Sequence, residues 1–148
     1  MKNHSYRQGL KLQRTAADAG TLKLLRKWFP GRSLSELRQT VGDHGYVYLT
    51  DAEPFHADGE RKLARLLKEC DGAGIGTELY EEVWSGGVWR AQPMSRDYLR
   101  NALRRSREIE RETLLDIERE TEGFVSPEAL ADIEAETAAH WDGENLDG

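Results

Sequence analysis

Residues 30–38, PGRSLSELR, decide how the first half of this chain folds. Pro30 and Gly31 end one helix, because proline lacks the amide proton that a helix interior needs and glycine favours a turn. Ser33 and Glu36 then form a capping box, in which the side chain of each residue accepts a hydrogen bond from the backbone amide of the other. A capping box begins a helix. The stretch therefore predicts the end of one helix and the start of the next.

Alternating and helical patterns surround this junction. We expect the order strand, helix, helix, strand, helix, strand over residues 9–14, 21–29, 34–41, 46–50, 58–70 and 76–80. The third helix has the clearest pattern, because Leu63, Leu66 and Cys70 recur at positions i, i+3 and i+7, the spacing of one buried helix face. This spacing predicts that Cys70 is a core residue and not a reactive thiol.

A tight turn is expected at residues 85–87, whose sequence is SGG. Residues 88–90 would then return as an edge strand of a hairpin. Trp84 and Trp89 flank the turn. Aromatic residues in this arrangement are predicted to pair across the two strands as core residues and not as a binding platform.

Residues 93–148 are expected to be a helical extension. A long helix is predicted from Ser95 or Asp97 to about residue 122, and Ser126 followed by Pro127 is a start signal for a last helix. Together the patterns predict an α+β fold with three parts. These are a flexible terminus (1–5), a domain with a small three-strand antiparallel or mixed sheet covered on one side by three helices (6–92), and an acidic C-terminal helical hairpin (93–148).

The charges of the chain are unevenly placed. The chain has 21 Lys and Arg against 27 Asp and Glu, a net charge of −6. Residues 1–44 hold nine basic and three acidic residues, whereas fourteen acidic residues follow Arg107 and only Arg111 and Arg119 oppose them. Such asymmetry indicates two electrostatic surfaces, or an acidic end that folds back on a basic domain. Solvated helix faces are the simpler interpretation, and both are kept open.

Two short motifs carry a resemblance to a known family. Residues 22–26 (LKLLR) lie on the first helix, and residues 31–38 (GRSLSELR) open the second. With this order of elements, residues 7–81 resemble the C-terminal domain of the bacterial ribosomal stalk protein, which contacts translational GTPases. The resemblance implies the α+β fold of that domain and a contact face on its first two helices, which combines basic and apolar side chains. By position, this face would contain Lys23, Arg26, Leu34 and Arg38.

Two groups of basic residues are candidates for contact with a partner. On the first two helices, Lys23, Arg26 and Arg38 form either a solvated surface or a basic face for an acidic protein. Arginine suits such a face because its guanidinium group can engage a carboxylate with two hydrogen bonds. Further along, the arginine cluster of residues 96–107 is the best candidate for contact with nucleic acid, because Arg100, Arg104 and Arg107 share one helical face. Docking on the acidic last helix explains this second group equally well.

The sequence contains no clear catalytic arrangement. The four histidines lack the spacing of metal ligands, and the glycines of residues 71–76 follow a helix and precede a strand, the reverse of a dinucleotide-binding motif. Asp43 lies beside His44, but no nucleophile motif accompanies them. Residues 51–58 crowd acidic side chains and a histidine without the spacing of a calcium-binding loop. We therefore expect no enzymatic activity, no metal and no cofactor.

We expect a non-enzymatic bacterial protein that binds a protein partner through the basic helical face or the acidic C-terminal helices. It would act as an adaptor or inhibitor, and one version is an immunity or antitoxin protein whose acidic surface covers a basic site on its target. The alternative is a nucleic-acid-binding or translation-associated protein that uses the basic N-terminal block and residues 96–107. A single cysteine and the lack of a long apolar run favour the cytoplasm and no membrane contact. The identity of the partner and the oligomeric state stay open.

Overall fold

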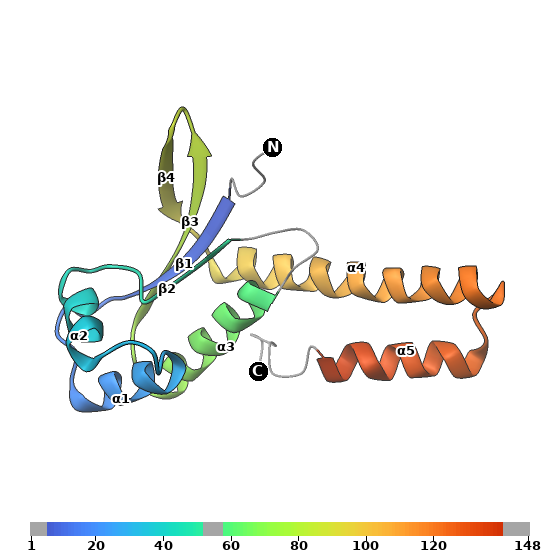
Figure 1. The fold of residues 1–148 in the computed structure, drawn as a ribbon, viewed down its shortest axis with the longest axis horizontal. Helices are drawn as coiled ribbons and strands as arrows, with labels where there is room; N and C mark the ends of the chain where they lie inside the picture. The colour runs from blue at the N-terminus through green and yellow to red at the C-terminus, as the bar shows by residue number, and fades with distance from the viewer. Residues whose placement is uncertain (1–5, 52–57, 141–148) are drawn as a thin grey trace.

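The computed structural model of this chain describes residues 6–51 and 58–140 as an α+β fold (Figure 1). The flexible terminus predicted for residues 1–5 lies outside these ranges. Within them, four strands form one sheet and five helices accompany it. The elements in chain order are β1 (Tyr6–Leu12), α1 (Ala19–Trp28), α2 (Leu34–Gly42), β2 (Tyr48–Asp51), α3 (Asp58–Gly72), β3 (Thr77–Ser85), β4 (Val88–Pro93), α4 (Arg96–Glu122) and α5 (Pro127–His140).

The sheet is antiparallel, and β1 lies inside it. The strand order is β2-β1-β3-β4, and Leu10 of β1 lies opposite Tyr48 of β2 and Leu79 of β3. The predicted sheet of three strands has a fourth, which is the hairpin strand expected at residues 88–90, and this β4 pairs with β3 along its whole length. The turn between these strands has positive φ at Gly86 (60°) and Gly87 (84°). Two such residues match the right-handed twist of the strands they join, so β3 leads directly into a fourth strand.

The core lies between the sheet and its helices. Fully buried leucines come from β1 and from four helices, and they are Leu10, Leu25, Leu37, Leu63, Leu66, Leu67 and Leu99. Cys70 is buried in the same cluster, as predicted, and this burial raises the pKa of its thiol to about 11. The expected cover of three helices is incomplete, because the first turns of α4 also enter the core.

α4 continues far beyond the body of the molecule, and α5 runs back beside it (Figure 1). Leu115 of α4 and Ile133 of α5 are both buried. Arg111 Nε lies 2.5 Å from Glu134 Oε1, so an ion pair also joins the two helices. Other apolar side chains in this part are open to solvent, and Ile117 is 54% exposed. Only part of the apolar surface of α4 is therefore used to hold the fold together.

Replacement of Leu99 by alanine tests whether α4 is part of the core. Leu99 has no exposed surface. Its truncation is expected to lower the free energy of unfolding by about 2–5 kcal/mol, because methyl groups are lost and a cavity remains. Ile117→Ala, further along the same helix, is the control and should change this energy by less than about 0.5 kcal/mol. Urea denaturation followed by circular dichroism measures both, and equal losses would contradict the entry of α4 into the core.

Glu60 is a charged group in a buried position. It lies in the first turn of α3 and is only 6% exposed. Burial raises the pKa of its carboxyl group above the ordinary value, and a hydrogen bond to Gln8 and the charge of Arg105 oppose this rise. In the window between the ordinary and the raised pKa, the folded protein holds a proton that the unfolded chain has released. Stability is therefore expected to increase as the pH falls through this window.

Glu60→Gln is expected to remove this increase, because glutamine keeps the shape of the side chain and does not titrate. The variant should be at least as stable as the wild-type protein at neutral pH, where burial of the carboxylate charge is unfavourable. Urea denaturation at a series of pH values measures the effect, with Glu108→Gln on the exposed surface of α4 as the control. A pH profile of Glu60→Gln that matches the wild-type profile would contradict this role of Glu60.

Candidate functional site

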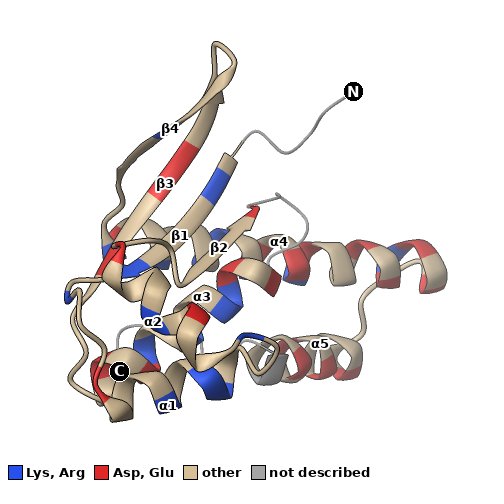
Figure 2. Cartoon of the chain, turned by 60° about the vertical axis from the view of Figure 1, so that its left-hand side comes forward, with Lys and Arg blue, Asp and Glu red and all other residues tan. Residues whose placement is uncertain are grey.

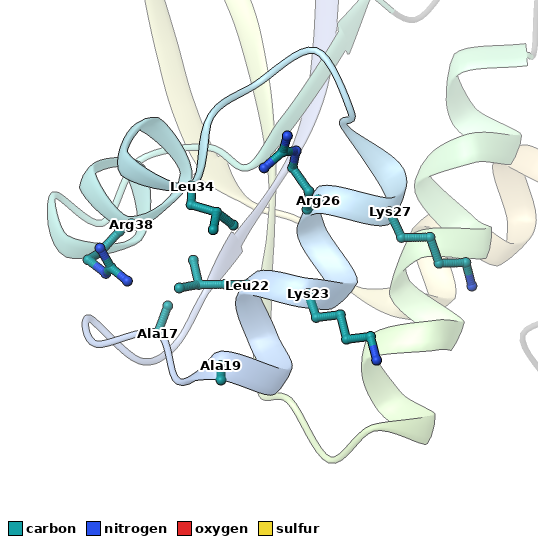
Figure 3. Close-up of a pocket in the computed structure, with 8 residues that line it drawn as sticks. All are labelled: Ala17, Ala19, Leu22, Lys23, Arg26, Lys27, Leu34 and Arg38. Carbon is teal, nitrogen blue, oxygen red and sulfur yellow. The ribbon is translucent and has the colours of Figure 1, made fainter.

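A cleft of about 560 Å³ lies between α1, α2 and the segment that precedes α1 (Figure 3). Figure 3 shows Leu22 of α1 and Leu34 of α2 turned toward each other across it. The lining combines small and branched apolar side chains with basic ones. The apolar members are Ala17, Ala19, Leu22 and Leu34, and the basic members are Lys23, Arg26, Lys27 and Arg38. The cleft therefore offers apolar contact and positive charge together.

α1 supplies three of the basic residues from one side of the helix. Lys23, Arg26 and Lys27 follow a spacing of three and four residues, which places them on one face. The opposite face carries the buried residues Leu24 and Leu25. The helix begins where Asp18 Oδ1 accepts a hydrogen bond from the Thr21 amide at 2.8 Å. Burial of the leucines thus holds the basic face toward solvent.

α2 begins at the predicted capping box, which the structure confirms. The Glu36 amide donates to Ser33 Oγ at 3.1 Å, and the Ser33 amide donates to Glu36 Oε1 at 3.2 Å. The hydrogen bond from the Ser33 backbone lowers the pKa of the Glu36 carboxyl group. Because the helix starts here, Leu34 and Arg38 lie one turn apart on the same face. This face turns to the cleft, and Leu34 remains 44% exposed.

The positive charge of the cleft is mostly uncompensated. Lys27 points away from α2, and its Nζ lies 3.1 Å from Glu69 Oε2 of α3. Lys23, Arg26 and Arg38 have no ion pair within residues 6–51 and 58–140. All three are exposed. An acidic ligand would therefore meet three cations without first displacing an ion-paired carboxylate.

The side chains that line the cleft are apolar or basic. None of the eight side chains is a carboxylate, an imidazole, a thiol or a hydroxyl group. The cleft can exclude water from an apolar group of a ligand through Leu22 and Leu34, and it can hold acidic groups with Arg26 and Arg38. This combination suits a segment that carries apolar and acidic side chains together.

The structure brings together one of the two predicted groups of site residues. Lys23, Arg26, Leu34 and Arg38 all line the cleft. Arg100 and Arg104 lie on α4, away from it. Arg100 pairs with Asp97 in the same helix, and Arg104 Nη1 donates to Asn101 Oδ1 at 3.2 Å. The remaining lining residues were not predicted, although the position of Lys27 four residues after Lys23 was a usable signal.

The aromatic residues beside the hairpin turn form a pair, but not in the core. The rings of Trp84 and Trp89 lie 5.5 Å apart at 66°, which matches the predicted cross-strand contact. The core prediction is wrong, because Trp84 is 47% exposed. β1 begins at Tyr6 opposite Val83, so Trp84 has no pairing partner on β1 among the described residues. Trp89 instead receives the guanidinium group of Arg7, at 3.7 Å from the ring centroid.

The other sites considered in the sequence show no cluster in the described ranges. His44 pairs with Glu78, at 3.0 Å between Nε2 and Oε1. Glu53 and His56 of the acidic loop lie outside the described residues, and no group of three possible metal ligands gathers among those that are described. Arg96 pairs with Asp71 of α3 at 2.7 Å.

No helix in the described ranges is long and apolar enough to span a bilayer.

The fold and the cleft define an α+β protein with a basic, partly apolar cleft on two helices. Comparison of the chain with protein-family models, with curated proteins and with solved structures gave no match.

Ser33→Ala tests the capping box that positions one wall of the cleft. The change removes the acceptor for the Glu36 amide, and it is expected to lower the free energy of unfolding by about 1 kcal/mol. Ser35→Ala is the matched control, because Ser35 is exposed and lies outside the capping box. Urea denaturation of both variants measures the difference. A loss for Ser35→Ala as large as that for Ser33→Ala would show that the box does not start α2.

Proposed function

We propose that this chain is a non-enzymatic protein-interaction module that binds an acidic, partly apolar segment of a protein partner in the cleft between α1 and α2. The observation that carries the proposal is the composition of the cleft. Leu22 and Leu34 lie among three cations that have no ion pair in the described residues. Binding would form charge-assisted hydrogen bonds at Arg26 and Arg38 and bury the exposed part of Leu34.

The proposed role agrees with the expected resemblance to the stalk domain. In that family the first two helices form the contact face, and we propose the same use for α1 and α2 here. We further propose that α4 and α5 act as an acidic helical hairpin that adds a second contact surface. Support comes from residues 108–136, which hold eleven acidic residues and only Arg111 and Arg119 as basic ones. An immunity or antitoxin role would use this surface against a basic target.

Nucleic-acid binding is the less favoured alternative. Two arginines of the cluster proposed for it are already paired, because Arg96 contacts Asp71 and Arg100 contacts Asp97. The cleft places apolar side chains among its cations, which suits a peptide better than a phosphate backbone. Binding of RNA or DNA through α4 would instead weaken steeply with salt and depend on Arg104.

A photo-crosslinking amino acid at position 34 tests the proposed function in the native host. Leu34 is exposed in the cleft, so a partner bound there is expected to form a cross-link that is absent when the same amino acid replaces Val88 on the hairpin. Mass spectrometry identifies the cross-linked protein. Its affinity for the purified chain, measured by titration calorimetry, should fall as salt is added.

Charge reversal in the cleft provides the decisive comparison. Arg26→Glu with Arg38→Glu is expected to weaken binding of the captured partner by about a hundredfold or more, since each of the two lost charged hydrogen bonds is worth more than about 1.4 kcal/mol. Lys68→Glu with Arg90→Glu changes the net charge equally outside the cleft and should leave the affinity nearly unchanged. Equal effects of the two double variants, or cross-linking to nucleic acid alone, would overturn the proposal.

A further inference from the structure

One end of the molecule has the composition that the cleft is suited to bind. We call residues 116–130, where α4 ends and α5 begins, the acidic tip. It contains five acidic residues and a single basic one, Arg119. Figure 2 shows Asp and Glu along the outer parts of α4 and α5, and Lys and Arg on α1. The chain thus carries both members of a complementary pair of surfaces.

The acidic tip also exposes large apolar side chains. Phe124 is 63% exposed, Ile117 54% and Leu130 39%. Phe124 follows Gly123, which ends α4 in the left-handed conformation (φ 85°). Carboxylates surround these residues, and Glu118, Glu120 and Glu122 have no ion pair in the part of the chain that the structure describes. The tip therefore combines unpaired acidic groups with apolar groups that lack cover.

The cleft and the acidic tip do not meet within one molecule. Figure 1 shows α1 and α2 at one end of the longest axis and the turn between α4 and α5 at the other end. Leu99 anchors α4 in the core, and Arg111 with Glu134 joins α5 to α4. These two contacts fix α4 and α5 relative to the rest of the molecule. The acidic tip of one chain can therefore reach only the cleft of a different chain.

We propose that a second copy of this chain supplies the occupant of the cleft, and that its acidic tip docks there. This inference rests on the proposed function of the cleft and names its partner. Arg26 and Arg38 pair with carboxylates of the tip, while Leu22 and Leu34 cover one of its exposed apolar side chains. Each copy has one cleft and one tip at opposite ends, so two antiparallel copies form both contacts at once. A reciprocal dimer closes the assembly and leaves neither surface open.

Analytical ultracentrifugation of the full chain at low and high salt tests this proposal. At low salt we expect a species of twice the 16.8 kDa chain mass, and added salt is expected to dissociate it because charge pairs hold it together. A chain that stays monomeric at low salt and the highest soluble concentration would overturn the proposal. A dimer that salt does not weaken would also overturn it, since a different interface would then hold the copies together.

Charge exchange between the two surfaces gives the sharper test. The cleft variant Arg26→Glu/Arg38→Glu and the tip variant Glu118→Arg/Glu120→Arg should each be monomeric, because each places like charges in both contacts of its own dimer. A mixture of the two variants should form a dimer again, because opposite charges then face each other in both contacts. Recovery in the mixture also shows that both variants are folded. Failure of the mixture to associate, with both variants shown to be folded by circular dichroism, would contradict the contact.

Two controls separate this inference from the proposed function. Lys68→Glu/Arg90→Glu should leave the dimer intact, since neither residue lines the cleft. The position-34 photo-crosslink distinguishes the remaining outcomes. If the wild-type chain is monomeric and the cross-link captures another protein, the proposed function stands and self-association fails. If the chain dimerises and position 34 cross-links only to a second copy, the self-association proposal stands. The proposal that a different protein binds in the cleft is then contradicted.

Discussion

The position of β1 inside the sheet is the constraint on which the rest of the structure depends. Leu10 is fully buried and Leu12 nearly so, and both lie under the helices. Side chains alternate along a strand, so Gly9 turns to the other face, where a Cβ atom would lie 2.5 Å from the ring of Tyr46. A shift of one residue in the pairing would exchange the leucines for Lys11 and its neighbours. One strand therefore fixes the helical layer and the packing of the opposite face.

Local signals in the sequence predicted the elements well, because the interactions that start and stop helices lie within a few residues. The capping box at Ser33 and the apolar spacing that ends at Cys70 are examples, and both appear in the structure. Tertiary position was harder to predict. The periodicity of α4 indicates a helix but does not reveal that Leu99 enters the core while Ile117 stays outside. Trp84 illustrates the same limit, because its exposure depends on where β1 begins.

The candidate site could be predicted only in part for the same reason. Lys23 and Arg26 share a face of one helix, which spacing alone shows. The convergence of Leu34 and Arg38 on that face depends on the packing of α2 against α1, through buried residues such as Leu25 and Leu37. The pairing of Lys27 with Glu69 joins residues 42 positions apart, so no local sequence pattern predicts it. Residue types were thus predictable, whereas their assembly into a cleft required the fold.

The placement of charge along the longest axis affects how this molecule is oriented when it approaches a charged surface. The cleft at one end of a single copy is basic and the acidic tip at the other end is acidic, so the two ends carry opposite charge (Figure 2). Near any charged surface, a torque turns the molecule before contact is made. In physiological salt this torque acts within about 8 Å of that surface. The chain therefore arrives with a preferred end forward, and the sign of the surface selects which end.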